Sequence, residues 1–161
     1  MTLVTCQADL AQPDHARAVL SLMEIYARDP MGGGEGLSEQ ARAQLIPSLH
    51  RWPTSRVVLG FVGDEPVALA IGFLGFSTFA CQPLLNVHDV VIHPAYRGQG
   101  LTRPLFEALE AVAREAGCCK ITLEVLEGNK PARRAYESLG FRGYQLDPAL
   151  GQALFWEKKL S

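Results

Sequence analysis

Apolar residues recur along the chain with a period that changes several times, and each change predicts a new element of secondary structure. Residues 2–7 alternate between apolar and polar side chains and predict a first strand. From Pro13 onward the apolar residues recur at helical spacing. The apolar face of this predicted helix comprises Ala16, Val19, Leu20, Met23 and Tyr26 or Ala27. The chain is therefore expected to begin with a strand followed by an amphipathic helix.

A glycine-rich run interrupts the helical pattern at residues 29–36. Proline and clustered glycines both break helices, so this run predicts a loop. Ser38 follows as the expected N-cap of a second, short helix. Because loops often carry function, we expect this one to lie over a site.

Strand-forming residues dominate the next part of the chain. Residues 56–62 and 67–79 predict two strands joined by a turn at residues 63–66, which makes an antiparallel hairpin, and residues 84–92 predict a further strand. The run 67–87 contains no charged residue and has the length of a membrane span, for which about 20 apolar residues suffice. Glycine, proline and hydroxyl residues within it favour two buried strands with a bend instead. We therefore expect no membrane association.

The pattern becomes helical again at residues 105–116, and Gly117 follows as a stop signal. Residues 119–126 predict another strand. A strand, a helix and a strand joined by short loops form a right-handed parallel crossover by default. The middle of the sheet is therefore expected to be parallel.

The end of the chain is expected to hold a short helix at residues 129–139 and two last strands at residues 141–146 and 153–160. Together the elements predict an α/β (α+β) fold with a mixed central sheet, antiparallel in its N-terminal half and flanked by about four helices. A length of 161 residues fits a single domain, residues 1–161, because folded domains most often have roughly 100–150 residues.

The charge and cysteine content narrow the classes of partner and compartment. A formal net charge of −2 and a pI near 6.1 give no basic surface of the kind that nucleic-acid binding requires, so no nucleic acid is expected as partner. The four cysteines form neither a disulfide framework nor a CxxC pair, and the first ten residues lack the pattern of a signal peptide. A cytoplasmic protein is expected.

A glycine-rich turn at residues 93–100 leads from a predicted strand directly into a helix. The first N–H groups of a helix have no partner within it, and glycines let a phosphate approach the backbone, so this turn is a candidate anion site with Arg97 as its charge. An ordinary turn with a solvated arginine has the same pattern. The Walker loop is excluded because no Gly-Lys-Ser/Thr follows, and the dinucleotide fingerprint GxGxxG fails at Arg103.

Residues 89–101, Asp-Val-Val-Ile-His-Pro-Ala-Tyr-Arg-Gly-Gln-Gly-Leu, resemble the acetyl-CoA-binding motif of the GNAT superfamily of N-acetyltransferases, whose signature is Arg/Gln-x-x-Gly-x-Gly/Ala. Arg97 and Gly100 fit this signature, whereas Thr102 stands where glycine or alanine is usual. A second block, residues 129–141, resembles the family's Asn-x-x-Ala-x-x-x-Tyr-x-x-x-Gly-Phe.

This resemblance extends from about residue 56 to the C-terminus and implies a GNAT-like fold, acetyl-CoA as the acetyl donor, no metal, and a homodimer. It also implies that the fourth strand and the loop after it bind acetyl-CoA, with the pyrophosphate on the loop. The implied cofactor-binding residues are Val90, Val91, Ile92, Arg97, Gly98, Gln99, Gly100, Leu101, Thr102 and Asn129. Asn129 would bond the pantetheine arm or merely cap its helix.

The implied reaction needs a base, because an amine must lose a proton before it attacks a thioester. At physiological pH an amine with a pKa near 10.4 is neutral in about one molecule in a thousand, which costs about 4 kcal/mol. His88 is the leading candidate, since the unperturbed pKa of histidine is near 6.5. Asp89 competes with it, and because neighbours on a strand point to opposite faces only one of the two is expected to face the site. The alternative for His88 is a structural histidine that fixes the strand.

The reaction also needs an acid for the departing thiolate and a donor for the oxyanion. Tyr136 occupies the position of the family tyrosine that gives a proton to the thiolate, and the pKa values of a phenol and a thiol, about 10 and 8.5, lie close. Its alternative role is packing on the helix. The resemblance implies that a backbone N–H of Val90 to Ile92 binds the oxyanion.

The acceptor is expected to be a primary amine of a small molecule, either polyamine- or diamine-like or amino-acid-like. Residues 76–79 and 84–89 resemble the diamine and polyamine acetyltransferase branch, although that branch commonly carries a glutamate where His88 stands. A protein amine is the alternative acceptor. Acidic residues that could receive a cation are Glu24, Asp29 and Glu35.

Three other classes of function fit the residues of this chain less well than acetyl transfer does. A sensor that binds acetyl-CoA without turnover predicts loss of the catalytic groups, whereas Tyr136 and His88 are both present. A nicotinamide oxidoreductase is disfavoured because the third glycine of the GxGxxG fingerprint is missing. Glu124 does lie near the distance in sequence at which an acid that binds the ribose is expected. A metal enzyme is disfavoured because His88, Asp89 and His93 would not converge along one strand.

Overall fold

The computed structural model describes residues 2–160. It divides into two compact parts, Met1–Leu123 and Glu124–Ser161, which are described separately. The elements of the first part, in chain order, are β1 (Val4–Gln7), α1 (Pro13–Arg28), the 3-10 helix η1 (Pro30–Gly32), α2 (Glu39–Arg51), β2 (Ser55–Val62), β3 (Glu65–Ser77), β4 (Gln82–Ile92), the 3-10 helix η2 (Pro94–Tyr96), α3 (Thr102–Glu115) and β5 (Ile121–Leu123).

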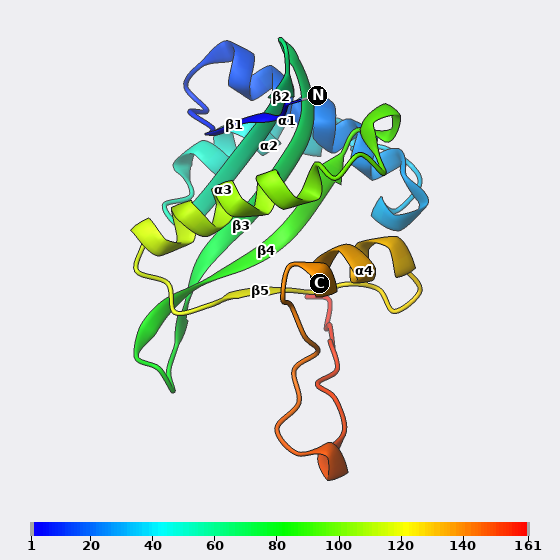
Figure 1. The fold of residues 1–161 in the computed structure, drawn as a ribbon. Coiled ribbons are helices and arrows are strands. Elements are labelled where there is room, and N and C mark those ends of the chain that lie inside the picture. Colours follow the sequence, from blue (N-terminus) through cyan, green and yellow to red (C-terminus); the bar gives the residue numbers. More distant parts are fainter. Residues whose placement is uncertain (1, 161) are drawn as a thin grey trace. The chain divides into compact units, whose positions relative to one another are not determined.

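The first part is built on a five-stranded sheet in the order β1-β2-β3-β4-β5. The strands β1 to β4 pair antiparallel, and β5 pairs parallel to β4 after the crossover through α3. This confirms the predicted mixed sheet, including the hairpin of β2 and β3. The parallel pair lies at the edge of the described sheet and not in its middle, because no further strand follows β5 within residues 2–160. Figure 1 shows α3 on one face of the sheet and α1 with α2 on the other.

The face under α1 and α2 holds a hydrophobic core. Leu22 of α1 and Leu49 of α2 pack against alternate residues of the strands, among them Leu59, Ile71 and Val91. Full burial of such a side chain contributes roughly 1.5–3 kcal/mol, so this layer fixes α1 firmly against β2 to β4. The stripe that α1 buries is Ala18, Val19, Leu22 and Met23. It shares Val19 and Met23 with the predicted face, whereas Ala16 and Leu20 are only partly buried and Ala18 and Leu22 are buried instead.

The opposite face packs against α3, whose buried side chains are Leu105, Phe106, Leu109 and Ala113. Their helical spacing is the one that the sequence pattern predicts. Gly117 follows α3 with a φ of 72°, a left-handed conformation that glycine adopts without steric cost. The chain therefore turns back promptly into β5 and closes the parallel crossover.

The second part contains α4 (Lys130–Ser138) and the 3-10 helix η3 (Pro148–Leu150). The predicted helix is confirmed, and Gly140 follows it with a φ of 94°. The two predicted last strands are wrong, because residues 141–160 form no strand in the described part of the chain. The segments on either side of η3 share the hydrogen bond from Ala153 N to Tyr144 O, but an apolar alternation becomes a strand only when a ladder partner is present.

No helix within residues 2–160 combines the length and the apolar character needed to cross a membrane. The uncharged run that raised this question forms β3, the turn after it and the first part of β4.

Candidate active site

A β-bulge in β4 lies at the position of the predicted base. Ile71 of β3 pairs with Asp89, whereas the next residue, Gly72, pairs with Val87. His88 is therefore an extra residue between two ladder pairs. A bulge of this kind changes the direction in which nearby side chains point.

His88 and Asp89 both lie near residues that pack on the α1 side of the sheet. Phe73 and Tyr26 pack against the core under α1 and α2, and the His88 ring meets that of Phe73 with centroids 4.9 Å apart. Asp89 acts electrostatically on Tyr26 of α1. The bulge interrupts the alternation of side chains on which the expectation for these two residues depends.

The carboxylate of Asp89 stands in an environment that disfavours its charge. Burial raises the pKa of Asp89 above its usual value, and the nearby His88 opposes the shift. Burial, followed by the charges of Asp89 and Asp29, also raises the pKa of Tyr26. The C-terminal end of α1 and the bulge of β4 thus share a region of negative potential, while His88 itself is exposed.

One edge of β4 is open beyond the bulge. The parallel strand β5 pairs with β4 only over Leu85–Val87, shorter than the eight-residue strand predicted at 119–126. Among residues 2–160 no strand pairs with this edge from His88 to Ile92. Backbone groups on that edge are consequently available to a ligand rather than to a ladder.

The alternation of backbone groups shows which residues face the open edge. His93 N donates to Val67 O of β3 at 2.8 Å. Because successive residues of a strand direct their N–H and C=O groups to opposite sides, Val90 and Ile92 point away from β3 and Val91 points towards it. Of the three predicted oxyanion donors, Val90 and Ile92 therefore offer N–H groups to the open edge.

The glycine turn after β4 adopts the conformation that its sequence predicts. Gly98 and Gly100 have φ values of 74° and 78°, and an added Cβ would meet no atom within 4 Å at either position. The Gln99 side chain donates to Ala95 O at 3.1 Å and braces the turn. The two glycines thus provide a turn of unusual φ whose outer surface is open to an approaching group.

The N-terminus of α3 lies directly after this turn. Its N-cap is Leu101, a buried residue, and in the described part of the chain no side chain caps this end. The N-terminus of α2, by contrast, is capped by Ser38, whose hydroxyl accepts from Ala41 N at 3.1 Å. The first N–H groups of α3, beginning near Thr102, therefore retain their capacity to bind an anion.

Arg97 connects the turn to two other elements. Its Nε donates to Ile92 O at 3.1 Å, which satisfies a carbonyl on the open edge of β4. Its Nη2 lies 2.8 Å from Oδ2 of Asp29. The N–H of Met31 and the Arg97 guanidinium together lower the pKa of Asp29, which is therefore a stable anion.

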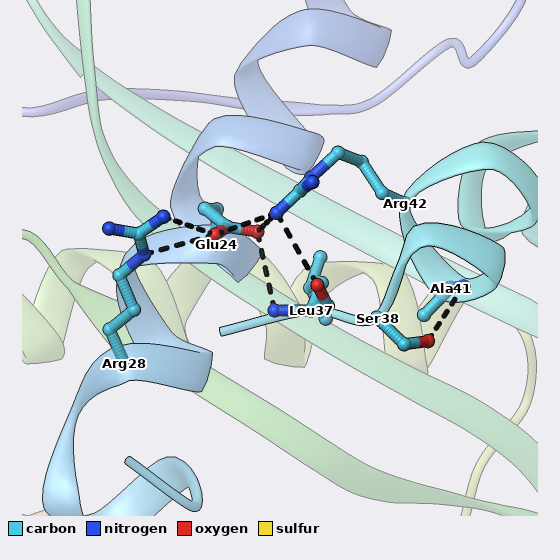
Figure 2. Close-up of polar contacts among 6 residues, drawn as sticks. All are labelled: Glu24, Arg28, Leu37, Ser38, Ala41 and Arg42. Carbon is cyan, nitrogen blue, oxygen red and sulfur yellow. Dashed lines mark hydrogen bonds and ion pairs between the residues drawn. The ribbon is translucent and has the colours of Figure 1, made fainter. Parts of the chain in front are cut away.

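Glu24 organises the far end of the loop between α1 and α2 (Figure 2). Its carboxylate accepts hydrogen bonds from Arg28 Nε at 3.0 Å, Arg42 Nη2 at 3.0 Å and Leu37 N at 3.3 Å. Arg42, then Arg28, lowers the pKa of Glu24. Two arginines thus balance the charge of Glu24, which leaves it poorly suited to the role of cation receptor predicted for it, and Glu35 is exposed in the loop.

In the second part, α4 carries the remaining predicted residues. The side chain of Asn129 accepts from Ala132 N at 3.3 Å and so caps α4. Tyr136 lies on the partly buried side of α4, with its ring centroid 6.0 Å from that of Phe141. The capping and packing roles foreseen for these two side chains are therefore observed.

The structure adds Tyr26 to the predicted residues and gives Asp29 a defined partner. From the sequence, Tyr26 is predicted only as a member of an apolar helix face. Asp29 is predicted only as one of several acidic residues that could receive a cation. A tyrosine at the end of a helix followed by an Asp-Pro break is the only local signal for either residue. Their proximity to Asp89 and Arg97 depends on contacts between distant segments.

Within residues 2–160 no group of three or more histidine, cysteine, aspartate or glutamate side chains is arranged to hold a metal ion. His88, Asp89 and His93 belong to no such group.

The sequence profile of the Acetyltransferase (GNAT) family matches residues 19–141. This match includes the bulge of β4, the glycine turn and α4, and it extends across both compact parts.

Two characterised relatives align with most of the chain. Thialysine N-epsilon-acetyltransferase of Caenorhabditis elegans is 27% identical over 135 residues, which cover 80% of this chain and 78% of the relative. Streptothricin acetyltransferase of Streptomyces lavendulae is 38% identical over 131 residues, which cover 81% of this chain and 62% of the relative. Both names specify acetyl transfer.

The fold has close counterparts among solved structures. A possible acetyltransferase from Clostridium difficile 630 superposes with a TM-score of 0.77 over 99% of both chains at 18% identity. At this identity the likeness concerns the fold alone, and it agrees with the mixed sheet and the helices described above.

Proposed function

Because the chain belongs to the Acetyltransferase (GNAT) family, we propose that it transfers the acetyl group of acetyl-CoA to the primary amine of a small molecule. Membership makes it an acyltransferase, and the family uses acetyl-CoA as donor. The observation that carries the proposal is the open edge of β4, which leads into a glycine turn and an uncapped helix N-terminus.

The residues on this edge fit the chemical groups of acetyl-CoA. A pyrophosphate needs several N–H donors and a positive charge, which the turn from Gly98 to Gly100, the start of α3 and Arg97 supply. Thr102 opens α3 in place of the usual small residue, and its backbone N–H serves the same purpose. Asn129 contributes to the pantetheine arm in addition to capping α4.

Attack by the amine requires that its proton be removed. His88, exposed at the bulge, acts as the base that accepts it, and Asp89 beside it is the alternative base, since its raised pKa makes it a better proton acceptor than an ordinary carboxylate. The amine nitrogen then forms a bond to the acetyl carbonyl carbon. The N–H groups of Val90 and Ile92 stabilise the oxyanion that develops in this step.

Collapse of the tetrahedral intermediate breaks the carbon–sulfur bond. Tyr136 gives its phenolic proton to the departing thiolate. The proton that the base took from the amine then reaches Tyr136 through solvent and restores the phenol. The products are an N-acetylated amine and coenzyme A. Both parts of the chain contribute to one domain in this proposal, as the family match across residues 19–141 supports.

The acceptor is best described as a cationic amine. The carboxylate of Asp89, which stands beside His88 and acts electrostatically on Tyr26, attracts a protonated amine. The names of the two relatives, which specify thialysine and streptothricin, support an acceptor of amino-acid-like or polyamine-like chemistry. A protein amine is the second candidate. A cytoplasmic homodimer is proposed from the family resemblance.

Release of coenzyme A thiol, measured with acetyl-CoA and a panel of amines, tests this function. The panel contains thialysine, lysine, a diamine, a polyamine, an aminoglycoside and a peptide with a free N-terminus. We expect the small cationic amines to give the largest kcat/KM. Release with the peptide alone would favour a protein acceptor, and binding of acetyl-CoA without release for any amine would favour a sensor.

A further inference from the structure

Asp29 and Arg97 form the contact on which this inference depends. Arg97 Nη2 lies 2.8 Å from Asp29 Oδ2, and the side chain of Asp29 is 18% exposed while that of Arg97 is 48% exposed. The two residues come from different elements, the end of α1 and the glycine turn before α3. The guanidinium assigned to the pyrophosphate therefore already has a carboxylate partner within its own chain.

Asp29 also determines how the loop to α2 begins. Its other carboxylate oxygen accepts from Met31 N at 2.9 Å, and its carbonyl oxygen accepts from Gly32 N at 2.8 Å. Gly32 lies so close to Tyr26 that an added Cβ would stand 2.0 Å from Tyr26 O. The ion pair thus connects the cofactor turn to the tightly folded start of the loop, next to Tyr26.

A pyrophosphate and Asp29 compete for the same donors of Arg97. A guanidinium presents its N–H donors in a fixed planar fork, and a paired contact with a phosphate uses two neighbouring nitrogens. Nε of Arg97 is committed to Ile92 O at 3.1 Å and Nη2 to Asp29, so a phosphate that pairs with both Nη groups must displace the carboxylate from Nη2.

We propose that Asp29 competes with coenzyme A for the guanidinium of Arg97. The ion pair of Asp29 holds the loop from Asp29 to Leu37 against the cofactor turn, as a latch, until the pyrophosphate displaces Asp29 from Arg97. This inference rests on the proposed function, because it requires coenzyme A to bind at the turn. Its consequence is that coenzyme binding frees the start of the loop beside Tyr26, where the acceptor amine is proposed to bind. Cofactor binding and acceptor binding are then coupled through one ion pair.

The dissociation constant of coenzyme A, measured by titration calorimetry, tests the competition. In Asp29→Asn the amide still accepts from Met31 N, and removal of the charge should tighten coenzyme A binding roughly two- to fivefold, the range of a partly exposed ion pair. Asp14→Asn is the matched control, because Asp14 pairs with Arg17 on the exposed surface of the same helix. It changes the net charge equally and should leave the affinity unchanged.

A double-mutant cycle identifies Arg97 as the mediator. Arg97→Ala should weaken coenzyme A binding roughly tenfold, as expected for loss of a charge-assisted contact. In that background Asp29→Asn should have no further effect. Binding by Asp29→Asn that equals or falls below that of the wild type, or an Asp29 effect that persists without Arg97, would overturn the latch.

Hydrogen exchange of the loop provides a readout independent of affinity. Coenzyme A should accelerate exchange at Met31, Gly32 and Gly34 in the wild type, whereas in Asp29→Asn exchange at these amides should no longer depend on coenzyme A. Equal protection in all four samples would contradict the proposal. If no variant binds coenzyme A, the proposed function fails as well, but if Arg97→Ala weakens binding while Asp29→Asn changes nothing, only the latch is refuted.

Discussion

The imidazole of His88 meets the ring of Phe73 edge to face, with centroids 4.9 Å apart and an interplanar angle of 73°. Such a contact contributes about 0.5–1.5 kcal/mol and restricts the orientation of a side chain that is otherwise exposed. Phe73 in turn packs against the core under α1. The candidate base is therefore held by the hydrophobic core at one ring edge and open to a substrate at the other.

Replacement of His88 by glutamine should lower kcat/KM for the best amine by roughly 10²–10⁴-fold, because general-base catalysis contributes about that much. Steady-state kinetics with the amine panel measure this loss. His50→Gln is a suitable control, since His50 is an exposed histidine of α2. Should His88→Gln retain activity while Asp89→Asn loses it, Asp89 rather than His88 is the base.

Replacement of Asp89 by asparagine should stabilise the fold at neutral pH relative to the wild type. Burial raises the pKa of Asp89, so the folded state favours the protonated carboxyl group. The associated stability is present below the usual carboxyl pKa and is lost as pH rises through the raised value. The free energy of unfolding can be measured by urea denaturation between about pH 3.5 and pH 8. The difference between Asp89→Asn and the wild type should increase in favour of the variant as the pH rises. A difference that is constant with pH would contradict this assignment.

Replacement of Tyr136 by phenylalanine should lower kcat roughly a hundredfold or more while the KM for acetyl-CoA changes little. Phenylalanine keeps the ring that packs near Phe141 and removes only the hydroxyl. Tyr144→Phe is the matched control, because Tyr144 is an exposed tyrosine in the same part of the chain. Steady-state kinetics at saturating amine distinguish the roles, since a purely packing tyrosine would leave kcat unchanged.

Replacement of Gly72 by alanine should destabilise the protein by about 1–3 kcal/mol, the usual cost of forcing extra volume into a packed sheet. An added Cβ would lie 2.9 Å from Asn86 O and 3.0 Å from Leu85 Cδ1, beside the bulge. Gly75→Ala on the same strand is the control, because its nearest atom would be Leu84 Cδ1 at 3.4 Å. Thermal unfolding and kcat are the measurements, and equal effects of the two substitutions would show that the bulge tolerates the added methyl group.

The features that could be predicted from sequence are those set by local pattern. The hairpin of β2 and β3, the helix α3 with its glycine stop, and the turn at Gly98 and Gly100 all depend on residues close together in the chain. The same holds for the N-cap at Ser38. Each of these depends on local sequence, such as the spacing of hydrophobic residues or the conformational freedom of glycine.

The features that escaped prediction depend on distant partners. The bulge arises from the register between Ile71 and Asp89, and the ion pair between Asp29 and Arg97 joins a loop to a turn far along the chain. The predicted strands at 141–146 and 153–160 contain aromatic and aliphatic residues, but within residues 2–160 neither segment pairs with a strand. Local pattern carries no information on register or on which surface charges meet.

The carboxylates of Glu24 in α1 and Asp29 directly after it anchor the loop that follows. Asp29 holds the first residues of this loop and Glu24 holds Leu37 at its end, so both attachment points lie near the C-terminal end of one helix. The intervening residues, rich in glycine at positive φ, can be exchanged or lengthened at an entropic cost that grows only slowly with length. The loop between α1 and α2 can therefore change in sequence or length without disturbing either attachment point. In the proposed function, such changes would alter the choice of amine and leave the residues proposed for acetyl-CoA unchanged.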